Sequence, residues 1–224
     1  MTTVAVIQPY FFPYAGYFRL FTAADTVVMF DCVQFPRRGW VHRNRFATAN
    51  GELEWLTLPL EKAPRDVRIA DLRFSPGAQG RIEAQLARFP QLERARRSHD
   101  ALLERMLRID GAAAARYLIE RICDVTNALG IQRPLLRSSD FDLSPDLHGQ
   151  SRVIAAVKAA GGTRYVNPSG GRELYDHASF AACGIELGFL APYQGSYSSI
   201  LTRLLEESPE AIASEIRSET VVAP

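Results

Sequence analysis

The stretch TVAVIQPYFFPYAGYFRLFTAADTVVMFD, residues 3–31, decides the fold. Its two β-branched runs, TVAVIQ (Thr3 to Gln8) and TVVMFD (Thr26 to Asp31), are typical of strands in a buried sheet. Between them, YAGYFRLFTAAD carries apolar residues at helical spacing. Because a helix between two strands permits a right-handed crossover, the segment predicts two strands that are parallel and adjacent.

The later part of the chain repeats this alternation of strands and helices. Strands are predicted in PLLRSSDF, TRYVNPSGG and IELGFLAPY, with helices through SRVIAAVKAAGG and ELYDHASFAACG. EWLTLPL (Glu54 to Leu60) is a further strand candidate, and Arg68 to Phe74 is a short one within an irregular stretch rich in Pro, Gly and Arg.

A helical pattern occupies the middle of the chain. From Arg81 to Leu129, apolar residues recur at intervals of three and four, and Gly130 suits the end of a helix. Strands that alternate with helices indicate parallel βαβ units. The sequence therefore predicts one α/β domain over residues 1–224: an open, mostly parallel Rossmann-like sheet with a helical insertion or cap at about 81–129.

Composition disfavours several classes of protein. With 26 Lys and Arg against 25 Asp and Glu, the chain lacks the basic excess typical of nucleic-acid binders. No segment is apolar enough to cross a membrane, and the N-terminal run lacks a basic leader, so we expect a cytoplasmic protein. The scattered Cys32, Cys123 and Cys183 predict reduced thiols, and no cluster of His and Cys has metal-ligand spacing.

The predicted strand ends place four unusual segments at one edge of the sheet. Ligands of open α/β sheets bind outside the carboxyl ends of the strands. The segments that follow strands there are QPYFFPYAGYF, DCVQFPRRGWVHRNRF, SSDFDLSPDLHGQS and NPSGG. We expect the functional site at this edge.

DCVQFPRRGWVHRNRF, the arginine-rich segment (residues 31–46), contains Arg37, Arg38, Arg43 and Arg45. Guanidinium groups bind phosphate or carboxylate in a bidentate way, which favours a small anionic ligand. Internal salt bridges to residues such as Asp25 and Asp31 are the alternative. If the segment is extended, alternation places Arg43 and Arg45 on one side and Asn44 on the other.

Residues for acid/base chemistry are few. The candidates are Asp31, Asp140, His42 and His148, and Asp31 is the best placed because it ends a buried strand. NPSGG offers backbone N–H groups to a ligand, although a plain tight turn explains it equally well. SYSSI (Ser196 to Ile200) is typical of a helix N-cap.

Six motifs, taken in order, resemble one family. They are VIQPYFFPYAGYFRLFTAADTVVMFD, VQFPRRGWVHRNRF, WLTLPL, RSSDF, YVNPSGGRELYD and GIELGFLAPY followed by SSI. Together they resemble the WbqC-like family of bacterial proteins, found in surface-polysaccharide and natural-product gene clusters. The resemblance spans Val6 to about Leu205.

The resemblance implies a cytoplasmic transferase that attaches an acyl or aminoacyl group to an amino sugar or another small amine. It implies that no cofactor is tightly bound. It also implies that CoA or a carrier-protein thioester is the co-substrate and that an acyl carrier protein is a partner. The candidate catalytic residues are Asp31, His42 and Gln8. The candidate substrate-binding residues are Trp40, Arg43, Asn44, Arg45, Gln34, Tyr17, Asn167, Ser169 and Gly170. Cys32 stands where many relatives carry an acidic residue, which argues against a carboxylate pair at 31 and 32.

Two other functions fit the sequence. A nucleotidylyltransferase has a similar strand, turn and helix, but its turn carries an HxGH motif that this chain lacks. The second alternative is a non-catalytic binding or scaffold subunit of a polysaccharide assembly complex. Convergence of Gln8, Asp31, Arg43 and Asn167 in one pocket would favour an enzyme, whereas dispersed positions would favour a scaffold.

Overall fold

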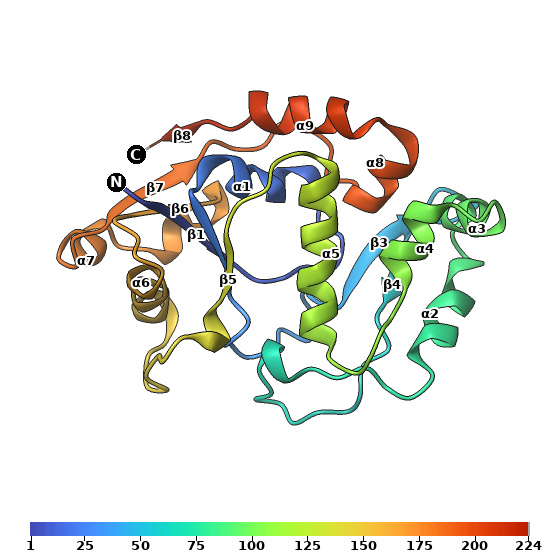
Figure 1. The fold of residues 1–224 in the computed structure, drawn as a ribbon, viewed down its shortest axis with the longest axis horizontal. Coiled ribbons are helices and arrows are strands. Elements are labelled where there is room, and N and C mark those ends of the chain that lie inside the picture. Colours follow the sequence, from blue (N-terminus) through green and yellow to red (C-terminus); the bar gives the residue numbers. More distant parts are fainter. Residues whose placement is uncertain (224) are drawn as a thin grey trace.

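The computed structural model describes residues 1–223, and its main feature is a six-stranded sheet in the order β5-β2-β1-β6-β7-β8. Five strands are parallel, and β8 pairs antiparallel with β7 at the edge (Figure 1). The strands are β1 Thr3–Ile7, β2 Thr26–Met29, β5 Leu135–Arg137, β6 Arg164–Asn167, β7 Glu186–Leu190 and β8 Val222–Ala223. The predicted α/β fold with an open, mostly parallel sheet is confirmed.

The first two strands pair as the sequence predicts. β1 and β2 are parallel neighbours with Val4 opposite Thr26. The chain between them forms a 3₁₀ helix, Ala15–Phe18, that continues into α1 (Arg19–Ala23). A short crossover therefore links two adjacent buried strands.

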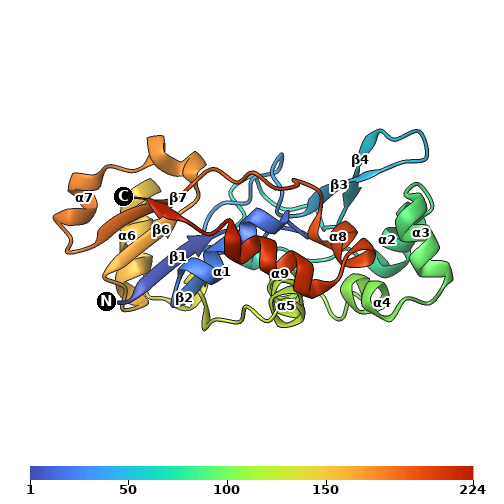
Figure 2. The same cartoon turned by 90° about the horizontal axis from the view of Figure 1, so that it is seen from above.

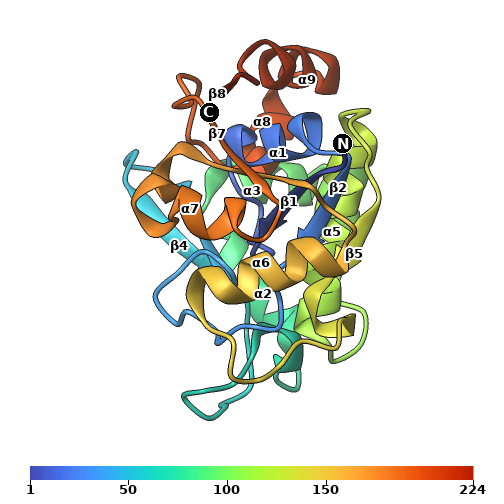
Figure 3. The ribbon, with the colours of Figure 1, turned by 90° about the vertical axis from the view of Figure 1, so that its left-hand side faces the viewer.

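Side chains that alternate along β1 divide the core into two layers. Val4 and Val6 pack with α6 (Gly149–Ala159) and α7 (His177–Ala181) on one face. Ala5 belongs to the larger cluster on the other face, which includes residues of α1, α5 (Ala114–Ala128) and α9 (Pro209–Ser218). Figure 3 shows α6 and α7 in front of the sheet.

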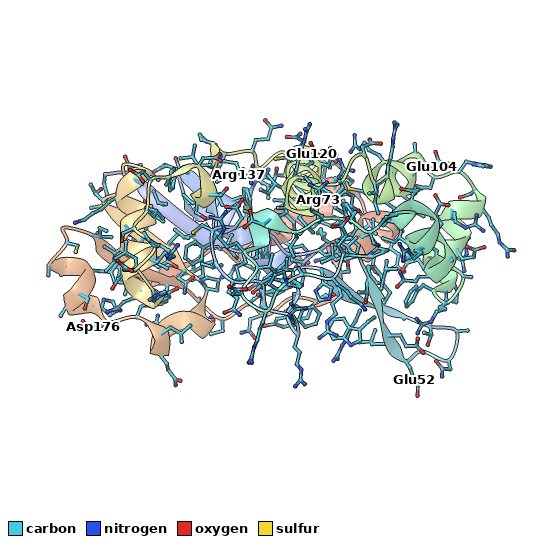
Figure 4. All side chains as sticks on the ribbon, turned by 90° about the horizontal axis from the view of Figure 1, so that it is seen from below. Glu52, Arg73, Glu104, Glu120, Arg137 and Asp176 are labelled. Carbon is cyan, nitrogen blue, oxygen red and sulfur yellow. The ribbon has the colours of Figure 1, made fainter. Side chains whose placement is uncertain are left out.

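Beside the sheet lies a second group of elements, around a hairpin of β3 (Arg43–Ala47) and β4 (Leu53–Thr57) (Figure 2). Its helices are α2 Ala78–Leu86, α3 Pro90–Arg97, α4 Ala101–Leu107 and α8 Ile200–Glu206. Glu52, in the turn between the strands, marks the projecting tip of the hairpin (Figure 4). The larger core cluster runs without interruption from the sheet into this region.

The structure tests three further expectations. The strand candidate EWLTLPL contains most of β4 (Leu53–Thr57), which pairs with β3 and is not part of the main sheet. The short strand expected at Arg68 to Phe74 is wrong: the chain makes a 3₁₀ turn at Ile69–Asp71, flanked by isolated bridges. As expected, the segment at about 81–129 is mostly helical, and it is divided into α2, α3, α4 and α5.

Within residues 1–223, no helix is both long and apolar enough to span a membrane.

Arg203 links the last two helices and provides a stability test. Its buried guanidinium forms ion pairs with Glu207 at 2.6 Å and with Glu215 of α9 at 2.7 Å. Arg203→Ala leaves both carboxylates without their partner, so we expect the free energy of unfolding in urea to fall by about 3 kcal/mol. The matched control, Arg116→Ala, removes an exposed pair with Glu120 and should cost at most about 0.5 kcal/mol. Equal losses in the two variants would contradict this role.

Candidate functional site

The order of the strands reverses between β1 and β6, and two candidate residues lie at that point. Connections run from β1 outward to β2 and β5, and then return to β6 and β7 on the other side. Gln8 follows β1 and Asn167 ends β6. Within residues 1–223, neither side-chain amide has a hydrogen-bond partner, so both remain candidates for ligand contact.

A groove lies between the turn after β1, the arginine-rich segment and the start of α8. It consists of two adjoining cavities of about 370 and 450 Å³ that share Trp40, Asn44 and Tyr197. The first cavity is completed by Tyr10, Pro13 and Tyr14. The second is completed by Arg45, Phe46, Ala47, Leu53, Gln91, Ser196, Ser198, Ser199 and Thr202. Aromatic rings therefore line one end, and hydroxyl groups with one arginine line the other.

Asn44 fastens the arginine-rich segment to the turn after β1. Its buried side chain donates from Nδ2 to the carbonyl oxygens of Phe11 at 3.0 Å and Phe12 at 2.5 Å. In return, the Phe11 N–H donates to the Trp40 carbonyl at 3.0 Å. These bonds satisfy polar groups that would be costly to leave buried and unpaired, and they fix the wall of the groove.

The start of α8 is fastened to the same turn. Ser199 is the N-cap of α8, as predicted, and its Oγ also donates to the Phe12 carbonyl at 2.9 Å. The Ile200 N–H donates to the Pro13 carbonyl at 2.9 Å. Phe12 has a φ of 46°, a left-handed conformation that is uncommon for a bulky residue. Such strain persists only where surrounding contacts hold it, and it is frequent at ligand sites.

Arg43 and Arg45 lie over one indole ring. Their guanidinium carbons are 4.0 and 4.7 Å from the centre of the Trp55 ring, so they share the side of β3 that alternation predicts. Trp40 lies 5.1 Å from Trp55, ring centre to ring centre. Arg45 is exposed and lines the groove, whereas Arg43 donates to the Arg38 carbonyl at 2.9 Å. Arg45 is therefore the better placed of the two to bind an anion.

The arginine-rich segment is not neutralised by salt bridges. Among the residues that the structure describes, no carboxylate lies within ion-pair distance of Arg37, Arg38, Arg43 or Arg45. Arg37 instead donates to the carbonyl oxygens of Ala63 and Pro64 at 2.7 Å, and Gln34 donates to that of Arg65 at 2.7 Å. Arg37 and Gln34 thus hold the neighbouring loop, and the cationic charge stays available to a ligand.

Asp31 is fully buried at the end of β2, and its carboxylate joins β2 to β5. It pairs with Arg137 at 2.9 Å. It also accepts bonds from the Ser138 hydroxyl at 3.1 Å and from the Ser139 N–H and hydroxyl at 2.9 Å. With both oxygens occupied in this way, Asp31 lacks the free lone pair and the substrate access that a general base needs.

His42 is half-buried in a different cavity, of about 290 Å³, beside Phe35 and Leu58. Its Nδ1 is buried and has no partner within the described residues. Burial, and secondarily the charge of Arg43, lowers the pKa of His42 to about 4. The imidazole is therefore neutral at pH 7, and it does not line the groove that contains Trp40 and Asn44.

The other candidate residues lie away from the groove. Tyr17 is buried and donates its hydroxyl to the Gln8 carbonyl at 3.0 Å, which makes it part of the core. Ser169 and Gly170 begin a 3₁₀ helix after β6, Ser169–Leu174. Asp140 closes a short 3₁₀ turn after β5, and His148 precedes α6 without capping it. None of these residues lines either of the two groove cavities.

Gln8, Asp31, Arg43 and Asn167 do not line the groove together. Of the candidate residues, Trp40, Asn44 and Arg45 line the groove. The sequence analysis does not name Tyr10, Tyr197 or Trp55 as candidates. The aromatic richness of QPYFFPYAGYF was the available signal for Tyr10. Trp55 meets Arg45 through the pairing of β3 with β4, which the sequence analysis does not predict. Tyr197 comes from a distant part of the chain, and nothing local indicates its contact with the arginine-rich segment.

The groove supplies binding chemistry more clearly than acid/base chemistry. Its lining contains no His, Cys, Asp or Glu. Burial raises the pKa of Tyr10 and Tyr14, so both phenols stay protonated and serve as hydrogen-bond donors at neutral pH. Among residues 1–223, no group of three or more His, Cys, Asp or Glu is placed to hold a metal ion.

Asp31 is predicted to matter for stability. Asp31→Asn loses the ion pair with Arg137 and weakens the bonds from Ser138 and Ser139, so we expect the free energy of unfolding to fall by about 3 kcal/mol. Asp140→Asn, an exposed neighbour on the same turn, is the control and should change it by less than about 0.5 kcal/mol. Urea denaturation measures both. A D31N protein as stable as the parent would show that these contacts contribute little.

The lowered pKa of His42 predicts a pH dependence of stability. Above pH 6.5 the imidazole is neutral in both the folded and the unfolded chain. As the pH falls towards 4, only the unfolded chain binds the proton, so stability is lost across this window. We expect His42→Gln to reduce the loss between pH 6.5 and 4 by about 2 kcal/mol, because partial exposure screens the full effect. Identical profiles of stability against pH for the parent protein and His42→Gln, measured by urea denaturation, would contradict a lowered pKa of His42.

Comparison with protein-family models assigns the chain to one family. A model of the WbqC-like protein family matches residues 8–203. Over 194 residues, the chain is 26% identical to a Mycobacterium tuberculosis protein named "Uncharacterized protein Rv1507c", and the match covers 84% of this chain and 81% of that protein. No solved structure matches. The family match covers most of the chain and every residue that lines the groove. This protein therefore belongs to the WbqC-like family.

Proposed function

We propose that the protein is a transferase that attaches an acyl or aminoacyl group to an amino sugar or another small amine, and that the groove holds the reactants. The observation that carries the proposal is the groove itself. It has aromatic walls, several hydroxyl groups and an exposed arginine that pairs with no carboxylate among residues 1–223. Hydroxyl and aromatic groups suit a sugar, and the arginine suits the anionic part of a donor or acceptor.

In the proposed reaction, the amine attacks the carbonyl carbon of a thioester from CoA or a carrier protein. A C–N bond forms and the C–S bond breaks, and the proton lost by the amine leaves with the thiol. Thioesters are activated donors, so positioning of the two reactants supplies much of the acceleration. The rigid turn at Phe12 and the hydroxyls of Ser196, Ser198 and Thr202 would provide that positioning.

A second candidate function is non-catalytic binding of a similar ligand. One observation favours it: the lining of the groove contains no carboxylate, imidazole or thiol to move a proton. Gln8, Asp31, Arg43 and Asn167 do not line the groove, which points the same way. Binding without turnover, measured on the same ligands, would select this alternative.

The transferase proposal predicts a new amide product. The protein is incubated with acetyl-CoA or an aminoacyl thioester and with a panel of amino sugars, and mass spectrometry follows the product and the released thiol. Arg45→Gln should reduce kcat/KM about tenfold or more, because one charge-assisted contact is lost. The kcat/KM of Arg45→Lys should lie between those of the parent protein and Arg45→Gln, since Lys keeps the charge but lacks the planar guanidinium group.

Arg73→Gln is the control, because Arg73 is exposed and does not line either cavity of the groove. It should leave kcat/KM within twofold. Equal kcat/KM for the Arg45 variants and the parent protein would exclude Arg45 from ligand binding. Absence of any amide product across the panel, with ligand binding intact, would leave the binding function in place of the transferase.

A further inference from the structure

The two ends of the groove differ in chemistry, and this difference defines a ligand class. We propose that the groove binds a nucleoside diphosphate group, with the base at the aromatic end and the diphosphate at Arg45. The inference rests on the proposed function, because it names a substrate class for the same groove. It concerns recognition only, and it does not depend on the group that is transferred.

The aromatic end has the surfaces needed to stack a flat ring. Tyr10, Tyr14, Trp40 and Tyr197 line this cavity. Trp40 is 42% exposed and Tyr197 is 68% exposed, which is unusual for such large side chains. Tyr197 is held in place by its ring contact with Tyr14, centre to centre 4.8 Å, and by a bond from its hydroxyl to the Tyr193 carbonyl at 3.2 Å. These rings are ordered by their neighbours and still open to a ligand, so stacking requires little further ordering.

The other end is suited to anionic oxygen atoms. Arg45 lines this cavity, and Trp55 holds its guanidinium beside that of Arg43. Two like charges over one ring repel each other, and no carboxylate in the described structure offsets them. A bound diphosphate would relieve this repulsion and accept bidentate bonds. The hydroxyls of Ser196, Ser198 and Thr202 are available for the polar groups beyond the phosphates.

The size of the groove fits a composite ligand. Each cavity, of about 370 and 450 Å³, is in the range of a pocket for a whole small molecule. The cavities adjoin through Trp40, Asn44 and Tyr197, so a ligand can extend through both. A single monosaccharide would leave one end empty. A base linked through a diphosphate to a second polar group would occupy both ends.

Two kinds of molecule contain this group: nucleotide-activated sugars and CoA. The first would make the groove an acceptor site, and the second would make it a donor site. Both share the base and the diphosphate, which are the parts that the aromatic and cationic ends recognise. The experiment therefore includes both molecules as separate arms.

Tryptophan fluorescence reports on this site alone. The chain contains two tryptophans, Trp40 and Trp55, and their rings lie 5.1 Å apart at the groove. The probes are UDP, ADP, the matching monophosphates and nucleosides, and inorganic pyrophosphate, each titrated against the full-length protein. We expect a nucleoside diphosphate to bind at least about tenfold more tightly than its nucleoside or pyrophosphate, because only the nucleoside diphosphate fills both ends of the groove.

Two substitutions separate the contributions of the ends. Tyr197→Ala should weaken binding of the nucleoside diphosphate about tenfold and leave pyrophosphate binding within twofold, since it removes a stacking surface and no positive charge. Arg45→Gln should weaken both ligands. Leu174→Ala, 70% exposed and outside the groove lining, is the control and should change neither. Circular dichroism checks that each variant is folded.

Titration with UDP-N-acetylglucosamine and with CoA then identifies the source of the nucleoside diphosphate. Tighter binding of the nucleotide sugar marks an acceptor site, and tighter binding of CoA marks a donor site. The inference is overturned if pyrophosphate binds as tightly as every nucleoside diphosphate, if Tyr197→Ala has no effect, or if no nucleoside diphosphate binds. Any of these results would leave the amide-forming assay unaffected. Conversely, nucleotide binding without an amide product would contradict the transferase proposal and support the inference.

Discussion

The buried side-chain amide of Asn44 is the interaction on which the groove depends. It binds the carbonyl oxygens of Phe11 and Phe12 and thereby joins the arginine-rich segment to the turn after β1. Ser199 binds the same Phe12 carbonyl from the start of α8. Three segments that are distant in sequence thus meet at one strained residue, Phe12. Without these bonds, buried carbonyl oxygens would be unpaired, and fewer contacts would hold the aromatic and cationic ends of the groove in a fixed relation.

The position of the groove relative to the sheet is informative. Open α/β sheets bind ligands where the strand order reverses, and here that point lies between Gln8 and Asn167. The groove instead lies where the turn that continues from β1 meets the β3–β4 hairpin and α8. The sheet therefore positions the groove through the chain that leaves β1. The amides of Gln8 and Asn167, which have no partner among residues 1–223, stay available at the strand ends, and Asp31 and Arg137 fix the neighbouring ends of β2 and β5.

Sequence patterns predicted the parallel strands of the sheet because they are short apolar runs that alternate with helices, and the runs of β1 and β2 are rich in β-branched residues. The β3–β4 hairpin was harder: Arg43, Asn44 and Arg45 have no strong preference for strands, and they are extended because they pair with β4. Alternation nevertheless placed the two arginines on one side, as the contacts with Trp55 confirm. Tyr197 could not be assigned to the site, because its neighbour Tyr14 is far away in sequence and the contact arises only from tertiary packing.

Hydrogen exchange in the Asn44→Ala variant tests most directly whether one amide organises the groove. The Phe11 and Ile200 N–H groups are the amides to follow, because they donate to the Trp40 and Pro13 carbonyls across the joined segments. The account predicts that exchange at both positions accelerates together, while the Val28 amide inside the main sheet keeps its rate. Unchanged exchange at Phe11 and Ile200 in a folded Asn44→Ala protein would show that the groove is held by other contacts and would contradict the account.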